Sequence, residues 1–269
     1  MEGLERLEEL KERMAGYAAD GDLCVAFSGG VDSALVLAAA MEAASPLGRK
    51  VYVVTFSTKL HGMGDLEAAE RVARELGAVH RIIEVDELAQ EEIRNNPRNR
   101  CDLCKKSLFV ELKRFASEVG AAWCLEGTNG DDLHSWRPGL QALKELEIES
   151  PLALLGISKE EVRALAKQYG VSVAHRPSSP CMATRLPYGT VLDHELLRRI
   201  DAAESRLRAW LGGNVRLRLH GDVARIEVDR ERFGQALMLN DDIVLELKKY
   251  GFHYVTRDLE GFRSGSMDE

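Results

Sequence analysis

One short turn near the amino end constrains the fold of this 269-residue chain more than any other feature. Residues Ser28 to Ser33, SGGVDS, follow an apolar run of β type, Leu23 to Phe27, and open an alanine- and leucine-rich helix from about Ala34 to Ala44. Adjacent glycines let the backbone turn sharply and approach an anion, while the first turn of a helix aims unpaired N–H groups at it. The sequence therefore predicts a strand, a phosphate-binding turn and a helix, in that order.

The composition of this turn limits the phosphate chemistry. Ser28 and Ser33 add hydroxyl donors, but the Gly-Lys-Ser/Thr ending of the ordinary mononucleotide loop, whose lysine reaches the β- and γ-phosphates, is missing. Transfer of a γ-phosphate is therefore not predicted. The alternative is a glycine turn that joins a strand to a helix and binds no ligand.

Strands and helices alternate along the first two thirds of the chain, which is typical of a doubly wound parallel sheet, an α/β fold. The expected strands after the first are 50–56, 79–85 and 122–125, and the expected helices are 4–17, 65–76 and 100–119.

A loop rich in glycine and carboxylates, Gly127 to Asp132, follows the last of these strands. Ligands of open α/β sheets lie beyond the carboxyl ends of the strands, so this loop and SGGVDS should share one edge of the sheet. The carboxylates, Asp131 among them, could hold Mg²⁺ through oxygen ligands. Plain Asx turns are the alternative.

A second domain is expected after a break in the pattern. Ser158 and Glu161 form a capping box for a helix that ends near Tyr169, and the two prolines in 175–181 rule out regular structure there. We place the boundary near 186–190, with a first domain of residues 1–187 and a small α+β domain of residues 188–269. The expected elements of the second domain are a helix over 193–211 and strands over 214–220, 223–229 and 252–257.

Charge and composition exclude several classes of protein. A formal net charge of −8 disfavours a large contact with nucleic acid, and the apolar stretches are too short and too broken by charge for a membrane span. The amino end shows no signal core, so we expect a cytoplasmic protein. Five cysteines in such a chain are expected as thiols or metal ligands.

The cysteines differ in context. Cys24 and Cys124 lie in apolar strands and should be inert. Cys101 and Cys104, near a helix start, can direct both sulfurs to one metal, and Cys181 could complete a three-thiolate site. Three thiolates would leave one iron of a [4Fe–4S] cluster open to an external ligand such as sulfide. A structural zinc with His175 or His134, a redox pair and unrelated thiols remain alternatives.

Alternation in the second domain points to an anion site. Over residues 215–220, Arg216 and Arg218 lie on the face opposite the apolar Val215 and Leu217, where two arginines can grip a phosphate. The alternative is a solvated strand face whose arginines pair with Glu227.

The whole chain resembles the ATP-dependent sulfur transferases of the LarE family, within the PP-loop superfamily of ATP pyrophosphatases. The resembling segments are SGGVDS, 99–101, 137–139, 150–152, 180–185, 187–189, 215–218, 220–221, 224–228 and 254–265.

The resemblance implies that ATP, with Mg²⁺, adenylates a carboxylate of a pyridinium mononucleotide and that sulfur then replaces AMP to give a thiocarboxylate. It also implies a homo-oligomer and a supply of sulfide or a sulfur-donor protein. The site residues implied are Ser28, Gly29, Gly30, Asp32, Ser33, Phe56, Gly127 and Asp131 for ATP, and Thr184, Arg185, Glu204, Arg216 and Arg218 for the mononucleotide.

The family divides by sulfur source. In one branch a lone cysteine at the place of Cys181 gives up its own sulfur, and a pair like Cys101 and Cys104 is absent. This chain has all three, so it resembles the branch that carries the sulfur on a [4Fe–4S] cluster. Sacrifice of Cys181, a tRNA thiolation enzyme, a non-catalytic nucleotide or iron–sulfur carrier, and an amidating synthetase remain alternatives.

Overall fold

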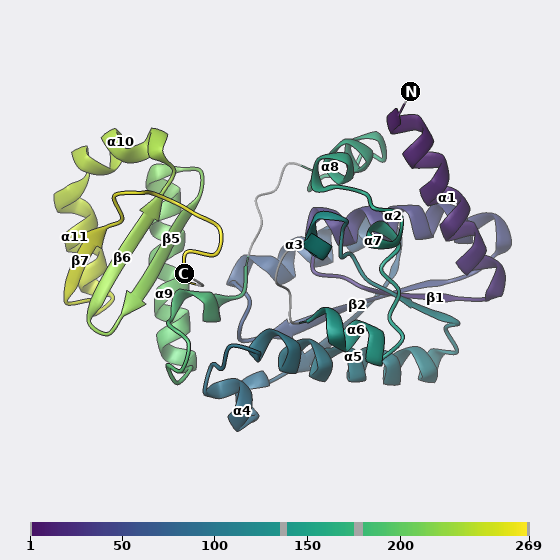
Figure 1. Cartoon of the computed structure of the whole chain (residues 1–269), viewed down its shortest axis with the longest axis horizontal. Coiled ribbons are helices and arrows are strands. Elements are labelled where there is room, and N and C mark those ends of the chain that lie inside the picture. Colours follow the sequence, from purple (N-terminus) through teal and green to yellow (C-terminus); the bar gives the residue numbers. More distant parts are fainter. Residues whose placement is uncertain (1, 135–138, 175–179, 268–269) are drawn as a thin grey trace. The chain divides into compact units, whose positions relative to one another are not determined.

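The computed structural model describes residues 2–134, 139–174 and 180–267 of the chain (Figure 1). It contains two compact units. The first comprises residues 1–58, 63–87 and 99–179, and the second comprises residues 59–62, 88–98 and 180–269.

The first unit is built on a parallel sheet of four strands in the order β3-β2-β1-β4. Each neighbouring pair is parallel, and Cys24 in β1 lies opposite Tyr52 in β2 and Cys124 in β4. This order confirms the predicted doubly wound α/β fold. The strands are β1 (Leu23–Ala26), β2 (Val51–Thr58), β3 (Val79–Val85) and β4 (Trp123–Leu125).

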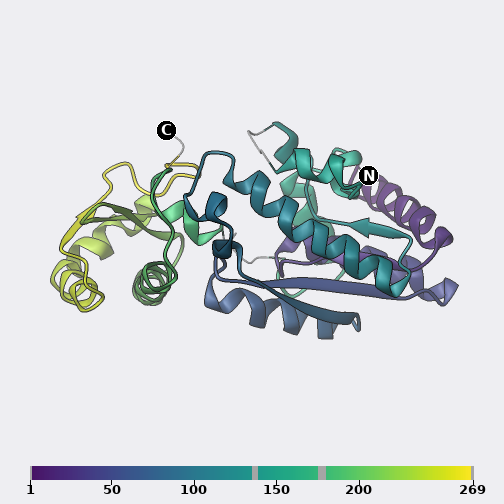
Figure 2. The same ribbon diagram turned by 90° about the horizontal axis from the view of Figure 1, so that it is seen from below.

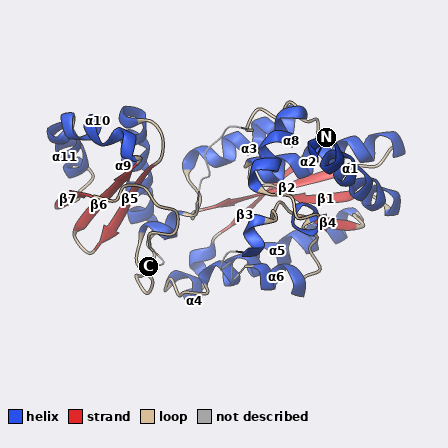
Figure 3. Ribbon diagram, turned by 45° about the horizontal axis from the view of Figure 1, so that its top comes forward, coloured by secondary structure: helices blue, strands red, loops and turns tan. Residues whose placement is uncertain are grey.

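Helices cover both faces of this sheet (Figure 3). Because side chains alternate along a strand, Leu23 and Val25 face one core and Cys24 faces the other. The first core holds residues of α1, α2, α3 and α8, and the second holds residues of α5 and α6; α5 runs along the sheet on the near side of Figure 2. The helices are α1 (Glu2–Asp20), α2 (Val31–Ala44), α3 (Met63–Glu75), α5 (Arg100–Val119), α6 (Leu140–Glu145), α7 (Pro151–Leu154) and α8 (Lys159–Gln168).

Most elements agree with the sequence pattern, with shifts at their ends. The bounds of β3 and α5 are those predicted, while α2 begins at Val31 instead of Ala34, so its first turn includes part of SGGVDS. The capping box of α8 is formed as predicted by Ser158 and Glu161. Two short helices, α6 and α7, are not predicted by the pattern.

The second unit has a sheet of three strands in the order β5-β6-β7. β5 and β6 are antiparallel, β6 and β7 are parallel, and α9 packs against both β5 and α11. This is the small α+β arrangement predicted for the carboxyl end. Its elements are α4 (Glu91–Arg94), α9 (His194–Leu211), β5 (Val215–His220), β6 (Val223–Val228), α10 (Phe233–Met238), α11 (Asn240–Lys249) and β7 (Tyr254–Arg257).

Two short segments from the amino-terminal half belong to the second unit. The Met182 N–H donates to the Leu60 carbonyl at 2.7 Å, and the Leu192 N–H donates to the Arg94 carbonyl at 2.7 Å. Residues 180–187 therefore lie with the second unit by contact, whereas the sequence places the boundary at 187. The roles predicted for the two domains stay predictions. In neither unit does a described helix have both the length and the apolar character needed to cross a bilayer.

Candidate functional site

The turn between β1 and α2 is held by serine hydroxyls. The Ser33 hydroxyl donates to the Gly30 carbonyl at 3.2 Å and accepts from the Ser28 N–H at 3.3 Å, and the two hydroxyl oxygens lie 3.2 Å apart. Ser28 is exposed and Ser33 is buried. The turn thus presents a hydroxyl and the N–H groups at the start of a 14-residue helix to an incoming anion.

Two glycines are required by close approach of backbone to backbone. Gly29 has φ +73°, and a Cβ there would lie 2.9 Å from the Ala69 nitrogen in α3. A Cβ on Gly127 would lie 2.6 Å from the Ser33 nitrogen. The loop after β4 therefore lies against the first turn of α2, as predicted for two loops at one edge of a parallel sheet.

Asp32 joins three segments of the first unit. One carboxylate oxygen accepts from the Asn129 side-chain amide at 3.0 Å, and the other pairs with the Lys159 ammonium group. The Lys159 backbone N–H donates to Asp131 at 2.9 Å. The residues predicted for ATP around Asp32, Gly127 and Asp131 are thus brought together, with Lys159 added.

Glu126 fixes the backbone of the loop after β4. This carboxylate, 6% exposed, accepts from the Thr128 N–H at 2.8 Å, the Thr128 hydroxyl at 2.9 Å and the Ser150 hydroxyl, and Lys105 lies 3.8 Å away. Because a buried carboxylate needs such donors, Glu126 holds the loop in one conformation. Phe56, also predicted to contact ATP, lies on β2, half-buried against the core on the α5 side.

The cysteines divide between the units. Cys24 and Cys124 are buried opposite each other in β1 and β4, and the contact with Cys124 together with burial raises the pKa of the Cys24 thiol. Cys101 and Cys104 lie near the start of α5, three residues apart and so on one side of the helix. Cys181 belongs to the second unit, as the residue before the short 3₁₀ helix 182–185.

The donor set around the cysteine pair is mixed. The Cys101 sulfur is exposed and accepts from the Arg100 guanidinium at 3.3 Å, whereas the Cys104 thiol donates to Glu87 at 3.8 Å. Among the residues that the structure describes, no three His, Cys, Asp or Glu side chains are grouped to hold a metal. Arg137, Pro138 and His175, which the sequence patterns single out, lie outside the described residues.

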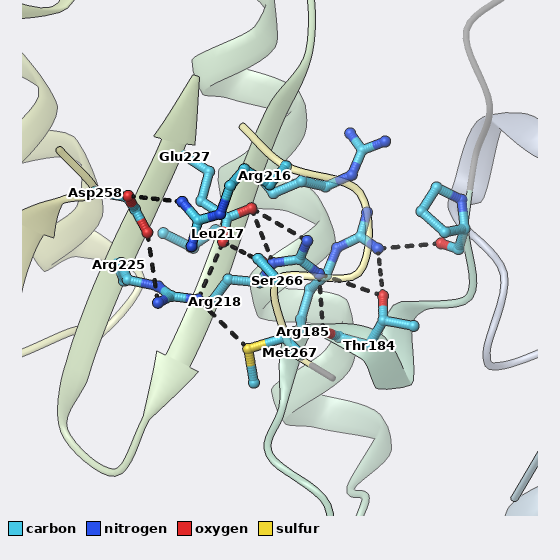
Figure 4. A network of polar contacts seen from close by, with 12 residues as sticks. Thr184, Arg185, Arg216, Leu217, Arg218, Arg225, Glu227, Asp258, Ser266 and Met267 are labelled. Atoms are coloured by element: carbon cyan, nitrogen blue, oxygen red, sulfur yellow. Dashed lines mark hydrogen bonds and ion pairs between the residues drawn. The ribbon is translucent and has the colours of Figure 1, made fainter. Parts of the chain in front are cut away.

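The second unit contains a buried network of arginines and carboxylates (Figure 4). Arg185 and Glu204 are 2% and 1% exposed and form two parallel hydrogen bonds of 2.9 and 2.7 Å. Glu204 also accepts from Arg208 at 2.7 Å and from the Leu217 N–H at 3.1 Å. Burial would raise the pKa of Glu204, but the hydrogen bonds and charge of Arg185 outweigh it and lower the pKa.

The two arginines predicted to bind phosphate lie in this network and are not solvated. Arg216 and Arg218 are 3% and 4% exposed. Arg218 pairs with Glu227 at 3.1 Å and donates to the Thr184 carbonyl at 2.8 Å, while Arg216 lies 3.7 Å from Glu204. The alternative of a solvated strand face is wrong on this point, although its pairing with Glu227 is present.

The carboxyl-terminal segment, residues 258–267, contacts this network. The Phe262 ring centroid lies 5.2 Å from the Arg216 guanidinium carbon, and the Ser266 hydroxyl donates to Glu227 at 2.5 Å. Arg225 pairs with Asp258 at 3.4 Å and with Glu227 at 3.1 Å. Figure 4 shows Ser266 and Met267 of this segment beside the arginines of β5 and β6.

Comparison with known proteins agrees with this geometry. A model of the asparagine synthase family matches residues 7–142, which include β1 to β4 and the turn at Ser28–Ser33. The pyridinium-3,5-bisthiocarboxylic acid mononucleotide synthase of Lactiplantibacillus plantarum is 38% identical over 246 residues, 91% of this chain and 88% of the relative.

Two further relatives place the chain within a wider group. The uncharacterized protein slr1717 of Synechocystis is 38% identical over 247 residues, 91% of each chain. The tRNA-specific 2-thiouridylase MnmA of Rickettsia felis is 30% identical over 198 residues, 58% of this chain and 52% of the relative. With nearly full-length similarity to the synthase and the serine- and glycine-built turn in place, the chain belongs to the LarE-type family of pyridinium-3,5-bisthiocarboxylic acid mononucleotide synthases, within the PP-loop superfamily.

Proposed function

We propose that this protein uses ATP to activate a carboxylate of a pyridinium mononucleotide and then replaces AMP with sulfur. The observation that carries the proposal is the turn at Ser28–Ser33, packed against Gly127 and lacking the lysine of γ-phosphate-transferring loops. The similarity to the Lactiplantibacillus plantarum synthase, whose name contains the bisthiocarboxylic acid product, supports the choice of acceptor.

The first half-reaction would take place at the nucleotide turn. A carboxylate oxygen of the mononucleotide attacks the α-phosphorus of ATP, and the bond from that phosphorus to the bridging oxygen of the β-phosphate breaks. Pyrophosphate leaves with the electron pair, and AMP becomes a good leaving group on the acyl carbon. The N–H groups at the start of α2 and the Ser28 hydroxyl would stabilise the charge of the leaving pyrophosphate, with the Ser33 hydroxyl holding the turn. Asp131, at the same edge, is an oxygen ligand suited to Mg²⁺.

The mononucleotide phosphate would bind at the arginine network. Within its described part, six arginines, 185, 208, 216, 218, 225 and 263, are paired with four carboxylates, Glu204, Glu227, Asp258 and Glu260. The excess of two positive charges matches a phosphate dianion.

The charge of the Arg216 guanidinium is consistent with this excess of positive charge. Burial, with the charges of Arg185 and Arg208, outweighs the opposing charge of Glu204 and lowers the pKa of Arg216 to about 10. The guanidinium therefore stays charged at neutral pH, and a phosphate would relieve the repulsion among the arginines. Because the Phe262 ring lies over the Arg216 guanidinium, a phosphate that binds Arg216 from this side would require Phe262 to shift.

We propose that Cys101, Cys104 and Cys181 hold a [4Fe–4S] cluster. The three thiols fit its ligand chemistry, and all three are exposed or half-buried, unlike Cys24 and Cys124. When bound, the cluster supplies an iron with an open coordination position for sulfur. The Arg100 guanidinium lies 3.3 Å from the Cys101 sulfur, beside this proposed ligand. Sulfide or a sulfur-donor protein supplies the sulfur, and we expect a cytoplasmic homo-oligomer.

A single reaction tests the activity. The anaerobic protein is incubated with ATP, Mg²⁺, sulfide and pyridinium-3,5-dicarboxylic acid mononucleotide; release of AMP and pyrophosphate is measured, and mass spectrometry detects exchange of oxygen for sulfur in the acceptor. Arg216→Ala should abolish use of the acceptor while ATP binding stays intact, and Arg198→Ala, at an exposed position of α9, should match the wild type. Equal loss of both functions in Arg216→Ala would contradict the division of the two sites. AMP formation that needs tRNA instead of the mononucleotide would replace this proposal with tRNA thiolation.

The sulfur source is tested separately. Iron and acid-labile sulfide should be found in the wild type and lost in Cys104→Ser, while Cys124→Ala keeps both. Protein without iron or sulfide after reconstitution, together with loss of one H₂S from Cys181 after turnover, would show sacrifice of that cysteine instead.

A further inference from the structure

Phe262 brings an aromatic ring to the arginine network of the second unit. The Arg216 guanidinium lies over the face of this ring, with its central carbon 5.2 Å from the ring centroid. Phe262 is half-buried, so part of its side chain stays accessible, whereas Arg216 is 3% exposed. A partly accessible ring is therefore in contact with an arginine that we propose as a phosphate ligand.

The backbone around Phe262 is anchored to the strand β6. The Phe262 N–H donates to the Val228 carbonyl at 2.8 Å. Gly261, with φ +81°, brings the chain so close to this strand that an added Cβ would lie 2.8 Å from the Val228 oxygen. Beyond the ring, the Ser266 hydroxyl donates to Glu227 at 2.5 Å. The chain is thus held on both sides of Phe262, and the ring has a fixed place beside the network.

The ring and a bound phosphate can contact Arg216 at the same time. The N–H groups of a guanidinium lie in its plane, so a phosphate accepts their hydrogen bonds at the edge of the group. Phe262 occupies the face instead. In a mononucleotide a single ribose joins the phosphate to the pyridinium ring, so a phosphate bound at this edge places the pyridinium within reach of Phe262.

The charge of the network leaves a need that this ring meets. An excess of arginines attracts a phosphate, but it repels the permanent positive charge of a pyridinium ring. The face of a phenylalanine ring is electron-rich and attracts cations. Such a ring has two faces, and the Arg216 guanidinium lies over one of them. The other face suits a second cation that is flat and aromatic.

We propose that Phe262 stacks on the pyridinium ring of the mononucleotide and selects a cationic ring over a neutral one. This inference rests on the proposed function. Stacking would also fix the plane of the pyridinium ring, and so the direction in which its carboxylate meets the activated phosphorus of ATP. Phe262 would act by binding and orientation, and it would exchange no proton or electron with the substrate.

Three ligands that differ in the ring test the inference by calorimetry on the full chain. They are nicotinamide mononucleotide, whose pyridinium is cationic, its reduced form, whose dihydropyridine is neutral, and ribose 5-phosphate, which has no ring. The wild type should bind the oxidised form about threefold to tenfold more tightly than the reduced form, the preference that a cation–π contact supplies.

Substitutions at the ring should change this preference alone. In Phe262→Leu the two mononucleotides should bind about equally, while the affinity for ribose 5-phosphate stays that of the wild type, and Phe262→Trp should keep the preference. Trp210→Leu is the matched control, because it removes a ring that lies over a different arginine of the second unit, Arg206, and it should match the wild type.

The outcomes separate this inference from a structural role and from the proposed function. Thermal unfolding shows that each variant is folded. Equal weakening of all three ligands in folded Phe262→Leu would show that the ring only holds Arg216, and would overturn the inference. An unchanged preference in Phe262→Leu, or a wild type without the preference, would overturn it as well. A wild type with a preference that depends on Phe262, but without AMP release in the activity assay, would contradict the proposed function alone.

Discussion

Gly127→Ala is the perturbation whose outcome the structure defines most sharply. The added Cβ would lie 2.6 Å from the Ser33 nitrogen, 2.9 Å from the Ser33 Cα and 3.0 Å from the Asp32 carbonyl carbon. All three are backbone atoms of the first turn of α2, so no side-chain rotation relieves the contact. Gly127 is not among the glycines with positive φ, so alanine fits its backbone conformation and the cost is steric.

The magnitude follows from forced displacement in a packed region. Overpacking of this kind costs about 1–3 kcal/mol, and we expect the free energy of unfolding to fall by that amount. Since the loop after β4 must move away from α2, the 3.0 Å hydrogen bond from Asn129 to Asp32 should also be lost. If the displaced turn also loses one hydrogen bond to the ATP phosphates, ATP affinity should fall by about tenfold.

Urea denaturation followed by circular dichroism measures the stability, and calorimetry measures ATP binding. Gly16→Ala is the matched control: Gly16 lies in α1, and a Cβ added there would have nothing within 4 Å, so alanine should stabilise the protein by about 0.5–1 kcal/mol. A Gly127→Ala protein with wild-type stability and wild-type ATP affinity would refute the close approach of the two segments.

Three other outcomes are expected. Glu204→Gln should lower the free energy of unfolding in urea by about 3 kcal/mol, because the buried Arg185 would lose its counter-ion. In acid, the wild type should lose stability as pH falls below about 4.3, since the pKa of Glu204 is lower in the folded protein than in the unfolded chain. Urea unfolding curves of Glu204→Gln should show a smaller loss of stability over this pH range. Mass spectrometry after iodoacetamide treatment of the metal-free native protein should find Cys101 alkylated and Cys24 unmodified, because Cys24 is buried with a raised pKa; early labelling of Cys24 would contradict this.

Local sequence signals predict the central fold well. β3 and α5 have the predicted bounds because their apolar patterns are long and the surrounding residues end them clearly. The short helices α6 and α7 escape prediction, since six and four residues carry too little periodicity. Their stability comes from buried residues such as Leu143 and Leu152, which contact parts of the chain that a local pattern does not include.

The candidate site separates in the same way. The turn at Ser28–Ser33 can be predicted from the sequence because six consecutive residues build it. Lys159 is 127 positions from Asp32, so a local pattern cannot predict their contact. Alternation along β5 separates Arg216 and Arg218 from the apolar side chains, but it cannot show that both arginines are buried or that Phe262 lies over Arg216. Burial of these side chains depends on contacts with distant segments, so a local pattern does not predict it.

The discontinuous make-up of the second unit has a consequence during synthesis. The Leu60 and Arg94 carbonyls accept hydrogen bonds from the N–H groups of Met182 and Leu192, and both are synthesised long before these partners. These two hydrogen bonds can therefore form only after residues 180–192 have been synthesised. A gene fragment that starts at residue 188 would encode β5 to β7 without residues 59–62 and 88–98. Its product should be less stable than the same sheet in the full-length protein.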